Sequence, residues 1–489
     1  MRKSILLMAA SAMAVTSVAS GGQVRSLNPR EVAEAQQQHA ALVREFGGAE
    51  TGSRGAYVES VGRRVAVHSG IANSAAAYRF TVLNSAVENA FAVPGGYVYV
   101  TRQLMALMND ESELGFALGH EVGHVAANHA QQRQSAQRRN SVLGVLGSIL
   151  GSVLGGSVFG DLLSQGAQQA AVMSTLRFSR EQEYQADSLG LRYLVAAGYD
   201  PAGGPGILAA LTRASAIEAR VQGRDNRQTP EWASTHPLSE NRVQRALMAA
   251  RQTGRLNMGL RNRDQFLNQL EGVYVDDDPA QGIIEGRTFT HPDLRLFFAV
   301  PQGYLMQNGT TEVSISGTAG KAQFSGGRYN GSLENYIGLV LQQLSGGQVR
   351  LSVPPPQRTT INGIPAAYTT ARANTSSGAV DVSVFAYQWN PNTVYHFVMI
   401  TRGGAGVGPF VPMVDSIRRI TPNEAAAIRP RIIDVHTVAP GDTVQSLASR
   451  MAYRTFQLDR FLSLNNLAAN SRLAPGQKVK LIIYGARRA

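Results

Sequence analysis

The chain has 489 residues, more than one hydrophobic core usually organises, so we expect roughly two to four domains. It contains no cysteine, which excludes disulfides, thiolate metal ligands and a cysteine-linked lipid anchor. The net charge of +12 favours contact with anionic surfaces, but basic and aromatic residues form no joint stripe, so we expect no nucleic-acid partner.

The first 20 residues have the pattern of a secretory signal peptide. Arg2 and Lys3 precede an apolar run, which the small residues Ala19 and Ser20 close. An uncleaved anchor is the alternative, although the run is short for a membrane span. We therefore expect a periplasmic or otherwise exported protein, with peripheral membrane contact as a further interaction.

The residue pattern of the remaining sequence changes twice, which predicts a multidomain α+β protein. Residues 26–255 alternate helical periodicity with one pair of strands and predict a mainly helical domain with a small sheet. Residues 270–421 are rich in short strand-like runs and predict an α+β domain of unknown role. A segment with two prolines, residues 422–431, resembles a linker into a small βααβ unit at residues 433–485.

Alternating apolar residues between Asn89 and Val100 predict a hairpin that turns at Pro94-Gly95-Gly96. At the edge of a cleft, a strand of this hairpin can pair with an extended peptide, which makes sequence selectivity loose. A hairpin with a purely structural role is the alternative.

The segment His120-Glu121-Val122-Gly123-His124 has the spacing of a metal site. Asp110 and Glu113 mark a helix N-terminus, and the absence of proline from there to about Arg139 predicts that the motif lies on a helix. His120 and His124 then lie one turn apart on one face, where both imidazoles can bind one ion. Glu121 beside them is the expected general base, because a carboxylate there can take a proton from an activated water. An ordinary exposed helix face is the alternative.

Residues 141–175 form an apolar insertion between the histidines and the next helix. A single membrane span there would place the ligands of one metal on opposite sides of a bilayer. We expect a lid over the cleft, with membrane-surface contact or burial against the core as alternatives.

A third ligand is expected from the helix that carries Glu183-Tyr184-Gln185-Ala186-Asp187. Glu183 and Asp187 lie one turn apart, so one carboxylate can bind the metal and the other the free N–H of a ligand histidine. Glu181 is the competing ligand. His129, five residues beyond His124, lies off the ligand face of an ideal helix and is expected to be structural.

With these motifs, the hairpin and His236-Pro237 followed by Arg242, about half of the chain resembles the M48 family of metallopeptidases. The resemblance implies a gluzincin-type fold, one Zn²⁺ per chain and Glu183 as its third ligand. It implies catalytic roles for Glu121, Asp187, His236 and Arg242, with His236 either stabilising the oxyanion or filling the open zinc position. It further implies that substrate contacts come from the hairpin residues Asn89, Ala90, Phe91, Tyr97, Val98 and Tyr99.

The segment from His436 to Val444, with Asn465-Asn466-Leu467 and Leu473 to Val479, resembles a LysM module. The resemblance implies a two-stranded sheet with two helices and peptidoglycan as the ligand. A module kept for packing or protein contact is the alternative. The middle domain resembles PsbP-like proteins only weakly, and Asp276-Asp277-Asp278 within it is expected to be a solvated loop.

The leading hypothesis is a periplasmic zinc endopeptidase that is tethered to peptidoglycan and degrades unfolded or mis-assembled envelope proteins. One alternative is a non-catalytic chaperone or scaffold at the cell wall that keeps a structural zinc site. Another is a peptidoglycan hydrolase, which the LysM-like segment alone supports. Glu121 separates the first two hypotheses, because a structural site needs ligands but no adjacent base.

Overall fold

The computed structural model describes residues 25–133, 178–221, 236, 240–345, 353–375 and 378–487. The expected signal peptide, the apolar insertion at residues 141–175 and Pro237 lie outside these residues. Among the described helices, none combines the length and the hydropathy that crossing a bilayer requires.

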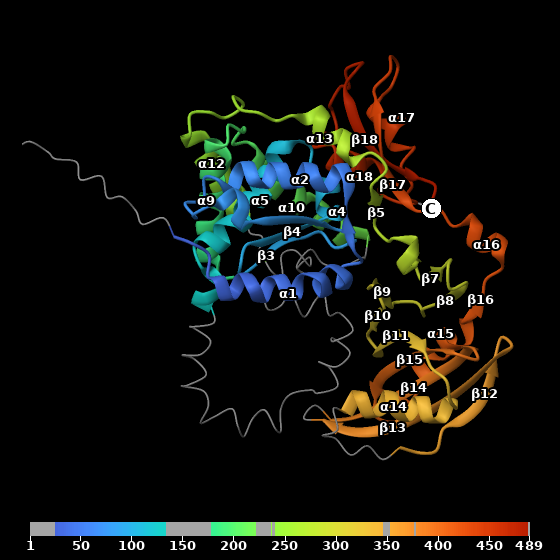
Figure 1. Cartoon of the computed structure of the whole chain (residues 1–489). Coiled ribbons are helices and arrows are strands. Elements are labelled where there is room, and N and C mark those ends of the chain that lie inside the picture. Colours follow the sequence, from blue (N-terminus) through green and yellow to red (C-terminus); the bar gives the residue numbers. More distant parts are fainter. Residues whose placement is uncertain are drawn as a thin grey trace, which may run out of the picture.

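The first unit, residues 25–270, packs helices around a four-stranded sheet (Figure 1). Its elements are α1 (Pro29–Glu45), β1 (Ala49–Glu50), α2 (Gly52–Ala66), α3 (Ser74–Ala77), β2 (Arg79–Leu83), β3 (Ala90–Val93), β4 (Tyr97–Thr101), α4 (Arg102–Leu107), α5 (Glu111–Ala126), α9 (Arg180–Ala196), α10 (Gly203–Val221), α12 (Glu240–Gln252) and α13 (Arg263–Leu270). The strands lie in the order β1-β2-β4-β3.

The predicted hairpin is confirmed, since β3 and β4 pair antiparallel with Val93 opposite Tyr97. Gly95 and Gly96 in its turn have φ values of 96° and 86°, which favour glycine. A Cβ atom on Gly95 would also lie 2.5 Å from the carbonyl oxygen of Glu31, so the turn sits directly against α1.

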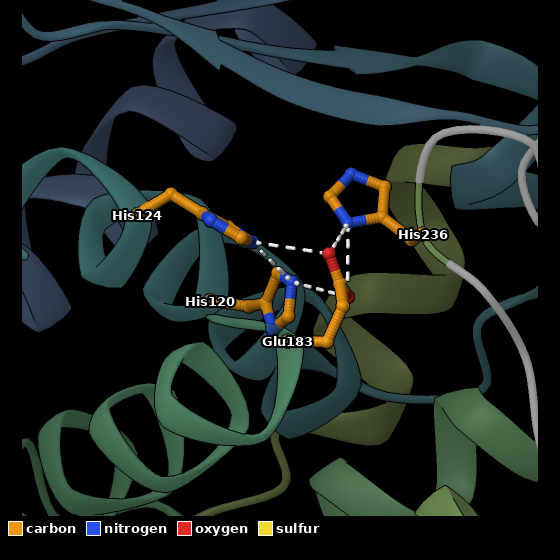
Figure 2. A group of neighbouring side chains, drawn as sticks. All are labelled: His120, His124, Glu183 and His236. Carbon is orange, nitrogen blue, oxygen red and sulfur yellow. Dashed lines mark hydrogen bonds and ion pairs between the residues drawn. The ribbon is translucent and has the colours of Figure 1, made fainter. Parts of the chain in front are cut away.

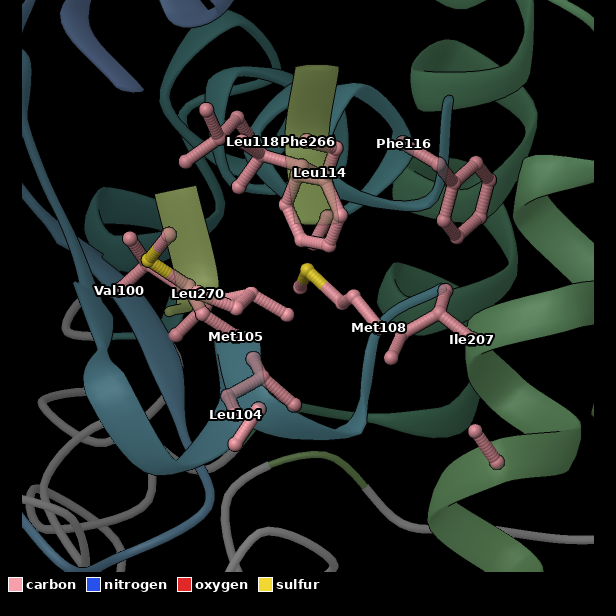
Figure 3. Packing of buried hydrophobic residues seen from close by; sticks show 14 of the residues in the cluster. Val100, Leu104, Met105, Met108, Leu114, Phe116, Leu118, Ile207, Phe266 and Leu270 are labelled. Atoms are coloured by element: carbon pink, nitrogen blue, oxygen red, sulfur yellow. The ribbon is translucent and has the colours of Figure 1, made fainter. Parts of the chain in front are cut away.

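Helix α5 runs through the centre of the first unit and is buried from Glu111 to His124. Asp110 caps it by accepting hydrogen bonds from the backbone N–H groups of Ser112 and Glu113, as predicted. Figure 3 shows apolar residues of α5 packed against the α4 region and α13. The motif from His120 to His124 lies on this helix, as predicted; α5 ends at Ala126, and Asn128 adopts a left-handed φ of 57°.

The middle unit, residues 274–421, contains a seven-stranded sheet in the order β12-β13-β14-β15-β11-β10-β9 and a four-stranded sheet in the order β16-β8-β7-β6. Helix α14 packs on β13 and β14, while the four-stranded sheet shares an apolar core with the opposite face. Its elements are β5 (Tyr274–Val275), β6 (Ile283–Glu285), β7 (Thr288–His291), β8 (Leu296–Ala299), β9 (Leu305–Asn308), β10 (Val313–Gly317), β11 (Gly320–Arg328), α14 (Leu333–Ser345), β12 (Gln357–Ile361), β13 (Ile364–Thr375), β14 (Gly378–Asn390), β15 (Thr393–Arg402), α15 (Val411–Ser416) and β16 (Arg418–Arg419). Helix α16 (Pro422–Ala427) follows the unit.

The C-terminal unit, residues 431–487, comprises β17 (Arg431–Thr437), α17 (Val444–Ala448), α18 (Gln457–Leu464) and β18 (Lys478–Tyr484). The expected two-stranded sheet has a third strand, because β5 pairs with β17. The prediction of a linker at residues 422–431 is also wrong in part, because this segment contains helix α16 (Pro422–Ala427) and the first residue of β17.

The C-terminal unit is docked on the first unit. Lys480 is fully buried, and its Nζ donates to the carbonyl oxygens of Ala106 at 2.8 Å and Met108 at 2.5 Å, just ahead of α5. Apolar residues of β17, β18, α17 and α18 belong to the same core as α4 and α5. Deleting this unit would therefore expose the core of the first unit, so its role must be tested with point variants.

Candidate metal centre

Two helices bring the predicted metal ligands together because they cross without intervening side chains. A Cβ atom on Gly190 of α9 would lie 2.9 Å from the backbone nitrogen of His120 on α5. The start of α9 is fixed by a capping box between Ser179 and Gln182, which places Glu183 in the first turns of the helix. The crossing therefore puts Glu183 opposite the two histidines of α5.

Four side chains converge in the site: His120, His124, Glu183 and His236 (Figure 2). Each offers a ligand atom, and these atoms lie within 4.8 Å of one another. The Nε2 atoms of His120 and His124 are 3.0 Å apart, and they lie 3.5 and 3.6 Å from oxygens of Glu183. Two ligand atoms on a tetrahedral zinc are about 3.3–3.5 Å apart, so the three side chains fit this ion.

A second layer of charged groups holds these ligands. Asp187 Oδ1 lies 3.0 Å from His120 Nδ1, so it can fix the tautomer that leaves His120 Nε2 free for the metal. Arg242 donates to both oxygens of Asp187 at 2.9 and 2.7 Å, and its Nη1 lies 2.9 Å from Glu183 Oε2. Asp187 and Arg242 therefore position the ligands and do not themselves face the ion.

The charges in the site shift the pKa values of its histidines in opposite directions. Burial lowers the pKa of His120, but the carboxylates of Asp187 and Glu183 outweigh it and raise the pKa to about 10. Burial and the neighbouring His120 hold the pKa of His124 well below its usual value. Without metal, a proton on His120 thus balances the carboxylates. Metal binding must displace this proton, so zinc affinity decreases as the pH falls.

Glu121 is buried beside the cluster, with an exposed fraction of 2%. Its Oε1 lies 3.6 Å from His236 Nε2. Burial raises the pKa of Glu121, while the imidazoles of His236 and His120 oppose the shift. A carboxylate held away from water near a metal cluster, but not needed as a ligand, has the placement of a general base.

His129, which the sequence predicted to be merely structural, contacts the metal site. Its Nδ1 lies 2.9 Å from His124 Nδ1, and its Nε2 lies 3.0 Å from Gln185 Oε1. If Gln185 accepts the proton of His129 Nε2, then His129 Nδ1 accepts the proton of His124 Nδ1, which leaves His124 Nε2 free for metal. His129 is not one of the four side chains that converge as metal ligands, in agreement with the prediction, but the left-handed turn at Asn128 brings it into contact with His124.

Only one of the predicted substrate-binding residues lies at the metal site. Ala90 of β3 lines a small pocket beside His120 and Glu121, and Ala92 lines a second hollow beside His124. In the described residues β3 is the last strand of its sheet, so a peptide can pair along it.

The roles predicted for the other hairpin residues need correction. Strand β4, with Tyr97, Val98 and Tyr99, is paired on both sides and has no edge for a peptide. Phe91 packs with Tyr99 in a separate apolar cluster. Asn89 is buried, and its backbone N–H donates to Thr101 Oγ1. These residues support β3 from behind.

Comparisons with known proteins agree with this geometry. Residues 53–250 match the family model of Peptidase family M48, and residues 436–481 match that of the LysM domain. The beta-barrel assembly-enhancing protease of Escherichia coli (strain K12) is 31% identical over 199 residues, which are 40% of this chain and 39% of that protein. The mitochondrial metalloendopeptidase OMA1 of Homo sapiens is 30% identical over 165 residues, which are 33% of this chain and 30% of that protein.

Residues 53–250 are therefore an M48 peptidase domain and residues 436–481 a LysM domain, as the motifs predicted. Zinc is the metal that M48 peptidases use, which agrees with the nitrogen and oxygen ligands of the cluster. The matches span only about two fifths of the length of the bacterial relatives.

The middle unit gains no support from solved structures. The solution structure of cyanobacterial PsbP from Synechocystis sp. PCC 6803 covers 28% of this chain at 10% identity with a TM-score of 0.24. A score this low supports no conclusion, so the PsbP-like resemblance stays a prediction.

The contacts of His129 generate a first prediction. His129→Leu removes the acceptor for His124 Nδ1 and should weaken zinc binding by about 10- to 100-fold. His129→Asn should retain most of the affinity, because its side-chain carbonyl can accept the same hydrogen bond. Titration of zinc against a competing chelator measures both. Equal affinity in His129→Leu and the wild type, at matched thermal stability, would show that His129 does not orient His124.

Proposed function

We propose that this protein is a zinc endopeptidase of the bacterial envelope that cleaves unfolded or mis-assembled proteins. The observation that carries the proposal is the buried carboxylate of Glu121 beside a cluster that fits one zinc ion. His120, His124 and Glu183 supply three protein ligands, which leaves one position open for reaction.

The residues of the site divide the reaction among them. Zinc, when bound, supplies Lewis-acid activation of water and of the scissile carbonyl. A peptide pairs along the open edge of β3 and presents its carbonyl between Ala90 and Ala92. Glu121 takes the proton of the attacking water and delivers it to the leaving nitrogen. Asp187 and Arg242 hold His120 and Glu183 in place throughout.

The substrate class follows from the chemistry of a backbone-pairing edge. Strand pairing reads the peptide main chain and demands an extended conformation, which folded proteins rarely present. The relatives named as beta-barrel assembly-enhancing proteases fit an envelope role. A non-catalytic chaperone or scaffold would have no use for Glu121, and a peptidoglycan hydrolase would have no use for the strand edge.

Removal of the base is the direct test of catalysis. Glu121→Gln should keep zinc but lose cleavage of casein, because an amide cannot accept the proton of the attacking water. His124→Ala should lose both zinc and cleavage, and a chelator should abolish the activity of the wild type. Undiminished cleavage by Glu121→Gln, or normal zinc content in His124→Ala, would contradict the assignment.

We propose that His236 acts as a gate that fills the open zinc position at rest. Its Nδ1 lies 3.0 Å from Glu183 Oε1, and its ring is fully buried among His120 and His124. A protease of loose selectivity needs such restraint.

The two possible roles of His236 predict opposite effects of His236→Ala on the rate of cleavage. If His236 is a gate, His236→Ala should speed inhibition by a zinc-binding hydroxamate and raise basal cleavage. If it stabilises the oxyanion instead, the same change should lower kcat by about a hundredfold or more. Stopped-flow inhibition and steady-state kinetics at matched zinc content decide between the two. If His236→Ala changes neither the rate of inhibition nor kcat, His236 has neither role.

The LysM domain supports a tether to peptidoglycan even though it is docked. Its two Pro-Gly loops, Pro440-Gly441 and Pro475-Gly476, are exposed, while Lys480 of the same domain is buried against the first unit. The loops thus stay accessible to an N-acetylglucosamine chain in the docked arrangement. A tether would hold the peptidase near the outer envelope, where mis-assembled proteins occur.

The tether can be tested without deleting the domain. Gly441 has a φ of 94°, so Gly441→Val should strain its loop and weaken cosedimentation with insoluble peptidoglycan. Gly404→Val places the same strain, at a φ of 95°, in the middle unit and should leave binding intact. Soluble N-acetylglucosamine oligomers should compete with the wild type. Equal sedimentation of both variants and no competition would exclude the tether.

A further inference from the structure

The three units enclose a cleft of about 480 Å³ to which the M48 and LysM matches assign no role. Helices α4 and α10 of the first unit form one wall, and β9 and β10 of the middle unit form another. Tyr453 and Arg460 of the C-terminal unit complete the lining. In Figure 1, β9 and β10 lie between the rest of their sheet and the first unit.

The cleft lies further along two helices, α4 and α10, that also line the small pocket at the metal centre. The small pocket beside His120 and Glu121 is lined by Leu104 of α4 and Leu208 of α10. Further along these helices, Leu107 and Ser215 line the cleft. The helical rise from Leu208 to Ser215 is about 10 Å, which corresponds to about three residues of an extended chain.

The wall from the middle unit is a sheet face. Ser314 pairs with Gln307 and Ser316 with Leu305, so these four side chains point to the same side. All four line the cleft, whereas α14 covers the sheet at β13 and β14. Leu305 is 38% exposed and gives this face an apolar contact beside its serine and glutamine side chains.

The charged side chains that line the cleft are Glu88, Glu218, Asp276 and Arg460. Arg460 lies 3.7 Å from Glu218, and Asp276 pairs at 3.0 Å with Arg431 outside the lining. The serine and glutamine side chains on the facing walls can donate to and accept from any peptide group. The lining therefore favours a hydrogen-bonding ligand that is not acidic, which describes an extended polypeptide main chain with neutral or basic side chains.

We propose that this cleft binds the part of an unfolded polypeptide that extends beyond the scissile bond. The middle unit is then a substrate-binding domain, and its outer face at β9 and β10 is the binding surface. This inference rests on the proposed peptidase function, because the metal centre defines where the chain enters. It gives a role to the placement of the middle unit beside α4 and α10.

A bulky residue in the cleft tests the proposal by binding, independently of turnover. The zinc-loaded Glu121→Gln protein is titrated into fluorescein-labelled, reduced and carboxymethylated lactalbumin, and anisotropy gives Kd. Adding Ser316→Trp should raise Kd at least about fivefold. Thr360→Trp, on the exposed far edge strand β12 of the same sheet, is the matched control and should leave Kd unchanged. A labelled dipeptide, too short to reach from one site to the other, should bind all three proteins alike.

The outcomes separate this proposal from the proposed function. Cleavage of casein by the wild type, with no effect of Ser316→Trp on Kd, would overturn the cleft and keep the peptidase. A higher Kd for Ser316→Trp, with no cleavage of casein by the wild type, would keep the cleft and overturn the peptidase. Displacement of the polypeptide by soluble N-acetylglucosamine oligomers would overturn it in favour of a glycan. Should Ser316→Trp fail to fold, Ser215→Trp on the opposite wall gives the same readout.

Discussion

The site depends on the close crossing of α5 and α9. Gly119 and Gly190 bring the two backbones together, and a side chain at Gly190 would collide with the main chain of His120. Because the helices meet there, residues earlier on α9 face residues later on α5. Asp187 thus reaches His120, and Glu183 reaches His124. The spacing of the ligands within each helix follows from the helix itself. The distance between the two helices is set by Gly119 and Gly190, which have no side chain at the crossing.

The local parts of this arrangement could be predicted from the sequence. One helical turn separates His120 from His124 and Glu183 from Asp187, and the hairpin turn at Gly95-Gly96 carries its own conformational signal. The role of His129 could not be predicted, because it depends on a left-handed residue that ends α5 early. The substrate residues were misassigned for a related reason: alternation identifies strands, but only the pairing order shows that β3, not β4, has the open edge.

The domains are more closely joined than their sequence boundaries indicate. The composition of the sequence predicted a linker ahead of the LysM domain. The burial of Lys480 could not be predicted, because it depends on carbonyl groups far away in the sequence. Lys480 satisfies two carbonyl groups at the end of α4, and leaving them without a donor in the core would be costly. The cleft likewise consists of residues from three units that no local pattern connects. The surfaces proposed here for catalysis, for peptidoglycan and for the substrate thus belong to units that pack against one another.

If α5 and α9 hold one catalytic zinc, the ion must be visible between them. Crystals of the zinc-loaded protein can be measured by diffraction on both sides of the zinc absorption edge. We expect one anomalous peak per chain, about 2.0–2.2 Å from His120 Nε2, His124 Nε2 and an oxygen of Glu183. A peak held by other residues, or no peak at these side chains in protein that cleaves casein, would contradict it.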